Sequence, residues 1–193
     1  PPNPAILLAF TQFSRLVREL PDAIVVIVAG NHDAPRSAET VCILRLFLPL
    51  GIHVVDTEAK RLTFPDRDLA VLAIPDTPAP RPALHPDTAF GRNVLVMHSE
   101  LRGIIPLSAT DTERAALQVD PDDIGYDRWS YVAMGEYHIH RRLHHNAFYS
   151  GALEYTSFNI WGELQEEKEA RLRGKGIVEY DLDTKKKVFH ALT

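Results

Sequence analysis

The sequence contains a single cysteine, Cys42, and no apolar run long enough to cross a bilayer. One cysteine excludes an internal disulfide and a zinc knuckle built from cysteines, and it favours a reducing compartment. A transmembrane helix needs about 18 or more apolar residues, and the start of the chain lacks the basic and apolar segments of a signal peptide. We therefore predict a soluble cytoplasmic protein in which Cys42 is a small core residue.

Positive charge is also scarce, because the sequence has 21 lysines and arginines but 26 acidic residues, which gives a formal net charge of -5. This balance argues against a protein that holds nucleic acid by bulk positive charge, so any such contact requires a local patch. Candidates for that patch are Arg141, Arg142, Arg171, Arg173 and Lys175. The charged run from Glu163 to Lys175 is typical of a solvated helix or linker, and Lys185 to Lys187 are typical of a solubilising hairpin edge.

The residue patterns of the first third of the chain predict alternating helices and strands. Apolar residues spaced three and four apart predict a helix over 6–20, and the β-branched run 23–29 predicts a strand buried on both faces. A second helix is expected over 38–48, with Ser37 as its N-cap and Gly51 just beyond its end. A short strand is expected at 52–55. These elements indicate an α/β unit.

The rest of the chain departs from simple alternation. Strands are predicted at 61–64 and 69–74 around a tight turn, and a proline-rich surface loop follows over 75–93. Further strands are expected at 94–97, 131–134, 147–149, 176–182 and 188–192, the last two joined through Asp183 to Lys185. A chain of 193 residues supports one compact domain. The prediction is a single α/β domain over 1–193 with mixed sheets.

Metal-capable side chains follow three of the predicted strands. Gly30-Asn31-His32-Asp33 follows the first, His98 the strand at 94–97, and Gly135-Glu136-Tyr137-His138 the strand at 131–134. Imidazole, amide and carboxylate groups suit Mn²⁺, Fe²⁺ or Zn²⁺, and a pair of such ions can hold a phosphate and activate water. An imidazole oriented by a carboxylate can protonate a leaving oxygen. The sequence therefore predicts phosphate chemistry at one sheet edge.

These motifs, in this order, resemble the calcineurin-like metallophosphoesterase superfamily, whose signature includes Gly-Asn-His-Asp and later histidines. Within it, the segment from Tyr131 to His138 followed by Tyr149-Ser150-Gly151 is most similar to the SbcD-type DNA-repair exonucleases. The likeness runs from about Ala5 to Trp161. It implies a four-layer α/β/β/α sandwich and a manganese-dependent hydrolase that cleaves phosphodiester bonds in DNA.

The resemblance also implies roles for individual residues. Asn31 and His98 would ligate one ion and His138 the other, while His32 would be the catalytic imidazole and Asp33 would orient it. Two divalent ions, Mn²⁺ foremost, are the implied cofactors. A coiled-coil ATPase and a second copy of the chain are implied partners beside DNA, and no membrane is involved.

Two departures from the family pattern leave alternatives open. The family's Asp-x-His and Gly-Asp-x-x-Asp motifs precede the first helix and are absent here, so we expect a fragment lacking its first β-α unit; a natural remnant is the alternative. Glu136 stands where the family has a histidine, and it either retunes the metal centre or abolishes it. An alternative register pairs His138 with His140. The rival functions are a non-catalytic scaffold with a degenerate site and a small-molecule phosphatase.

Overall fold

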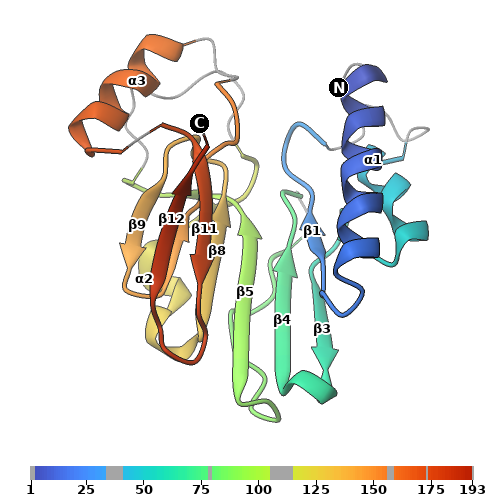
Figure 1. The fold of residues 1–193 in the computed structure, drawn as a ribbon. Coiled ribbons are helices and arrows are strands. Elements are labelled where there is room, and N and C mark those ends of the chain that lie inside the picture. Colours follow the sequence, from blue (N-terminus) through green and yellow to red (C-terminus); the bar gives the residue numbers. More distant parts are fainter. Residues whose placement is uncertain are drawn as a thin grey trace.

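The computed structural model describes residues 3–33, 41–77, 80–104, 115–155, 159–172 and 174–192, so Ser37 and Arg173 lie outside the described residues. The chain is a mixed α/β fold (Figure 1). Among the described residues, no helix combines the length and apolarity required to span a membrane.

The N-terminal helix α1 (Asn3–Glu19) confirms the first predicted element. Its aromatic face packs on Phe47, with ring centroids 4.8 Å away for Phe13 and 6.5 Å for Phe10. Phe47 belongs to η1 (Ile43–Leu50), which is a 3-10 helix and not the α-helix expected here. Pro49 lies inside η1 and lacks the N–H that a longer α-helix requires. Gly51 ends η1 in the left-handed conformation, as its position predicts.

Helices α1 and η1 share a core with the parallel pair β1 (Val26–Val28) and β2 (His53–Val55). The prediction that the first strand is buried on both faces is wrong, because all three residues of β1 are only half-buried. Within the described residues this sheet has two strands. The buried part of the predicted run is instead its last residue, Ala29, which buried Gly30 follows.

A six-stranded sheet with the order β3-β4-β5-β8-β10-β9 forms the centre of the molecule. Its strands are β3 (Lys60–Phe64), β4 (Leu69–Ile74), β5 (Arg92–His98), β8 (Tyr131–Gly135), β9 (Arg141–His144) and β10 (Ala147–Tyr149). The four central strands run parallel, while β3 and β9 are antiparallel edge strands. The carboxyl ends of β4, β5, β8 and β10 therefore meet at the upper edge in Figure 1.

The turn between β3 and β4 is η2 (Pro65–Arg67), closed by Asp68 in the left-handed conformation. One face of the sheet contributes alternate apolar residues such as Leu72, Leu95 and Val132 to the main core. Short elements cover this face: β6 (Glu100–Leu101), β7 (Gln118–Val119), α2 (Pro121–Ile124) and η4 (Tyr126–Arg128). Their buried residues include Leu101, Val119, Ile124 and Trp129.

The C-terminal part consists of α3 (Ile160–Glu169) and the antiparallel hairpin of β11 (Gly176–Tyr180) and β12 (Lys187–Ala191). The helix lies on the opposite side of the molecule from α1 (Figure 1). The charged run around it is not simply solvated, since Glu163, Glu167 and Lys175 are buried. Lys175 thus cannot belong to an exposed basic patch, and that part of the prediction is wrong.

The last lysine of the hairpin also makes contacts with the sheet. Lys187 donates a hydrogen bond of 3.0 Å to Nε2 of His140 and lies 5.5 Å from the centre of the Phe148 ring. Burial, and then the charge of Arg142, lower the pKa of Lys187. Lys185, Lys186 and Lys187 are all exposed, as predicted, and Lys187 also contacts the sheet through His140 and Phe148.

Candidate metal centre

The imidazole of His98 lies at the end of β5, between Gly30 in the turn after β1 and Gly135 at the end of β8. A Cβ atom at Gly30 would stand 2.6 Å from Cε1 of His98, and one at Gly135 would stand 3.0 Å from its Nδ1. Both separations are too short for a side chain to fit without displacing the ring. Glycine at both positions lets the turn after β1 and the end of β8 approach His98, so three sequence motifs meet here.

Glu136 completes this group. Its Oε2 accepts a hydrogen bond of 2.8 Å from Nε2 of His98, and its Oε1 accepts one of 3.1 Å from the N–H of Ala115. Burial by itself would raise the pKa of Glu136. The hydrogen bond and charge of His98 lower it, and the Ala115 N–H and His138 add to this effect, so the net shift of the pKa is downward. Glu136 is consequently a carboxylate aimed at His98.

The backbone of Glu136 has φ +120°, a conformation that residues other than glycine rarely adopt. Such conformations persist where the surrounding structure fixes them, and they cluster at functional sites. Here the two hydrogen bonds of the carboxylate supply that constraint.

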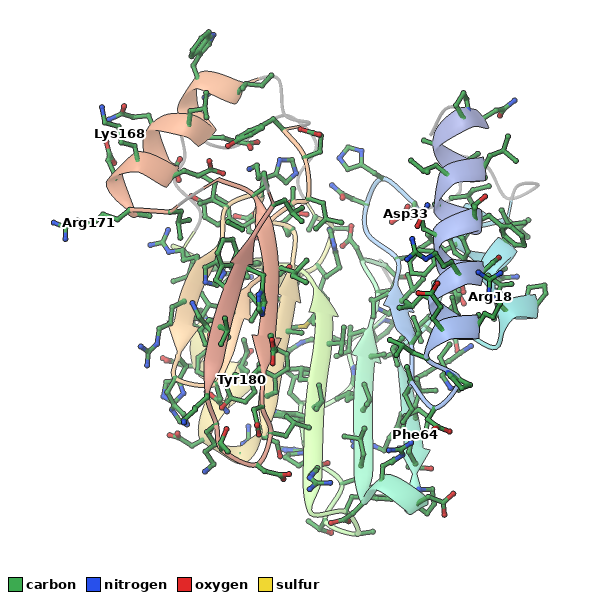
Figure 2. All side chains as sticks on the ribbon, viewed as in Figure 1. Arg18, Asp33, Phe64, Lys168, Arg171 and Tyr180 are labelled. Atoms are coloured by element: carbon green, nitrogen blue, oxygen red, sulfur yellow. The ribbon has the colours of Figure 1, made fainter. Side chains whose placement is uncertain are left out.

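The turn after β1 is held by Asp33. Its Oδ2 accepts a 3.0 Å bond from the N–H of Gly30, and its own N–H donates a 3.0 Å bond to the Gly30 carbonyl. The Asn31 Oδ1 accepts a 3.1 Å bond from the N–H of His32, and the His32 side chain is exposed. Asp33 thus shapes the loop that carries His32, at the upper edge of the molecule beside α1 (Figure 2). Its expected contact with His32 stays a prediction.

Asp76 is a further carboxylate at this edge that the sequence argument missed. It follows β4, its N–H donates a 2.9 Å bond to the Ala29 carbonyl, and its oxygens accept bonds of 3.1 and 2.8 Å from the N–H groups of Ala116 and Leu117. Asp76 therefore positions the segment whose Ala115 N–H binds Glu136. An acidic residue two positions after an apolar strand was the available signal.

His138 lies in the loop that follows β8, at the same edge of the sheet. Its Nδ1 lies 3.0 Å from Oε1 of Glu163, and its carbonyl accepts a 3.0 Å bond from the N–H of Ala152. Gly151, with φ +86°, allows this approach, because a Cβ there would stand 3.2 Å from the His138 carbonyl oxygen and 2.9 Å from the His140 nitrogen. The Tyr149-Ser150-Gly151 turn thus supports the histidine loop directly.

His140 has both ring nitrogens engaged by the protein. Nδ1 donates a 2.9 Å bond to the Tyr149 carbonyl, and Nε2 accepts from Lys187. Burial, helped by the charge of Lys187, lowers the pKa of His140 and outweighs the Tyr149 carbonyl, which raises it. Its ring also stacks on Phe189 at 4.6 Å. These contacts fix the β11–β12 hairpin to the sheet, and they favour the register in which Glu136 and His138 face the candidate centre.

A buried charged cluster lies behind His138. Lys175 Nζ contacts Glu163 Oε2 at 2.5 Å, Glu167 Oε1 at 3.0 Å and the His138 carbonyl at 2.9 Å. The Tyr155 hydroxyl donates a 2.7 Å bond to Glu167. The side chains of Lys175, Glu163 and Glu167 are only 5%, 8% and 5% exposed. This cluster joins α3 and the start of β11 to the histidine loop.

A separate group of metal-capable side chains lies at the carboxyl end of β9, away from the strand-end site. Asp127, His144 and His145 have ligand atoms within 4.8 Å of one another. Asp127 and His145 are exposed, while His144 Nδ1 lies 2.9 Å from Oδ1 of the buried Asn146. This surface group is distinct from the strand-end site and must be controlled for in any metal measurement.

Comparison of the chain with protein-family models, with curated proteins and with solved structures finds no match.

Replacing Gly30 with alanine is expected to displace His98. In the otherwise unchanged chain the added methyl group meets the ring, so Gly30→Ala should lower stability by about 1–3 kcal/mol, the usual range for overpacking. In a His98→Ala background the same change should cost far less, because the ring is gone. Denaturant unfolding of the four proteins measures this coupling, and equal costs in both backgrounds would contradict the packing of Gly30 on His98.

Proposed function

We propose that this chain forms the metal-binding core of a phosphoesterase domain that hydrolyses phosphodiester bonds in DNA with two divalent ions, Mn²⁺ being preferred. The proposal includes a four-layer α/β/β/α sandwich. The single observation that supports it most is the packing of His98 between Gly30 and Gly135, with Glu136 on its Nε2.

The donor set fits a divalent ion. His98 Nε2 and Glu136 Oε2 are 2.8 Å apart, close to the separation of about 3 Å expected for two ligands whose bonds to one ion are about 2.0–2.2 Å long. Asn31 adjoins the same glycine turn, and His138 is among the groups that lower the pKa of Glu136. Imidazole, carboxylate and amide oxygen together suit Mn²⁺.

Each residue has a proposed part in hydrolysis. Asn31, His98, Glu136 and His138 hold the ions, which supply charge neutralisation on the phosphate and activation of water. Exposed His32 donates a proton to the departing oxygen, which is the part of a general acid. Asp33 closes the turn on Gly30 and so places His32 at the rim of the site.

A second candidate function is a non-catalytic binding module. The observation that favours it is the same His98–Glu136 pair, because the imidazole and the carboxylate already satisfy each other at 2.8 Å. A metal ion would have to replace that hydrogen bond. Metal affinity therefore separates the two functions.

Isothermal titration with Mn²⁺ tests the proposal, in an Asp127→Asn/His145→Ala background that removes the exposed surface ligands. We expect at least one equivalent to bind there and binding to be lost when His98→Ala is added. Retained binding after His98→Ala would place the ion elsewhere, and absence of binding in the background protein would favour the non-catalytic module. Cleavage of a DNA duplex compared with p-nitrophenyl phosphate then separates a nuclease from a small-molecule phosphatase.

A further inference from the structure

The side chain of His138 is held by a carboxylate that is far more buried than the histidine itself. Glu163 Oε1 lies 3.0 Å from His138 Nδ1, and the two side chains are 8% and 39% exposed. An ionised carboxylate only accepts hydrogen bonds. Nδ1 must therefore carry the proton in the neutral ring, and Nε2 is left as the nitrogen with a free lone pair.

Glu163 is itself oriented by Lys175. The ammonium group lies 2.5 Å from the second oxygen of Glu163 and 2.9 Å from the carbonyl of His138. Lys175 thus contacts both the backbone of His138 and the carboxylate that holds its ring. Since Lys175 only donates hydrogen bonds, an oxygen must face it at the Glu163 position.

Glu167 provides an internal comparison. It lies one turn further along α3, is equally buried, and accepts from Lys175 at 3.0 Å and from the Tyr155 hydroxyl at 2.7 Å. Glu163 and Glu167 thus share Lys175, and Glu163 also contacts the His138 ring.

We propose that Glu163 is a positioning residue that fixes the tautomer of His138, so that Nε2 faces the divalent ion. The ligand half of this inference rests on the proposed function, whereas the tautomer half does not. Metal-binding histidines commonly donate their other ring N–H to a carboxylate, which sets the ring and raises its basicity. Helix α3 is thereby part of the centre although it contributes no ligand.

The variant Glu163→Gln tests the tautomer. Its amide oxygen must turn toward Lys175, so its NH₂ group faces Nδ1 and forces the proton onto Nε2. Nitrogen-15 NMR of the metal-free protein at pH 8 should show the Nδ1–H form in the wild type and in Glu167→Gln, and the Nε2–H form in Glu163→Gln. Both variants leave Lys175 with one carboxylate, so both should fold and show similar thermal midpoints.

The metal titration then completes the test. We expect Glu163→Gln to weaken Mn²⁺ binding by about 10–100-fold, the usual effect of losing such a partner, and Glu167→Gln to change it little. An unchanged His138 tautomer in Glu163→Gln overturns the inference. An inverted tautomer in a protein whose wild type binds no Mn²⁺ supports the positioning of His138 and overturns the proposed metal centre. Glu163→Asp, which keeps the charge, should retain the Nδ1–H form and is the second variant.

Discussion

Lys175→Met is expected to lower the free energy of unfolding by about 3–5 kcal/mol, the usual cost of removing one partner from a buried ion pair. Methionine has a similar length but no charge, so Glu163 and Glu167 would remain buried with no cation between them. The His138 carbonyl would also lose its 2.9 Å hydrogen bond. Urea unfolding followed by tryptophan fluorescence measures the loss.

Lys186→Met is the matched control, because it makes the same chemical change on the exposed β11–β12 turn. Surface substitutions usually change stability by less than about 0.5 kcal/mol. Adding Glu167→Gln to Lys175→Met should recover part of the lost stability, since it removes one unpaired charge. Equal stability of the two lysine variants would show that the buried cluster contributes nothing to folding.

Four of the strands that the sequence predicts correctly share one physical property, which is a local apolar run. β4, β5, β8 and β10 each contain such a run, and their predicted bounds lie within two residues of the observed ones. Periodicity likewise predicts α1. Burial on one or both faces leaves a direct signature in the residues themselves, so these elements need no long-range information.

The elements that were missed lack that signature. β9 contains Arg141 and Arg142 and forms only because β10 offers it an edge. β6 and β7 are two residues long and pair across the chain with each other. In η1, a strongly apolar sequence predicts a helix but not its 3-10 geometry. Tertiary pairing decides the conformation of β6, β7 and β9, whereas Pro49 disfavours an α-helix in η1.

The candidate site likewise has a part that local sequence predicts and a part that only tertiary contacts decide. Strand ends predict that the Gly30 turn, His98 and Glu136 reach one edge, and the structure brings these three together. The partner of His138 was not predictable, because Glu163 lies 25 residues away within a run of charges that normally faces solvent. Burial of Lys175 among carboxylates is a property of the folded chain alone.

His32→Ala is expected to lower kcat for cleavage of DNA by about 10²–10⁴-fold, the range typical of a lost general acid. The side chain is exposed, so the substitution removes no core packing. The backbone bonds of the turn, from His32 N–H to Asn31 and between Gly30 and Asp33, do not require the imidazole. Stability and Mn²⁺ affinity should therefore stay near those of the parent protein.

That separation of effects is what distinguishes a proton donor from a metal ligand. His98→Ala should lose Mn²⁺ binding and activity together, whereas His32→Ala should lose kcat while binding persists. A DNA substrate with a 3-nitrophenyl or other low-pKa leaving group gives a further readout, because such a group departs without protonation and should cleave nearly as fast in the variant. Unchanged cleavage of ordinary DNA by His32→Ala would refute the role of His32, and equal losses on both substrates would make it a phosphate-binding residue.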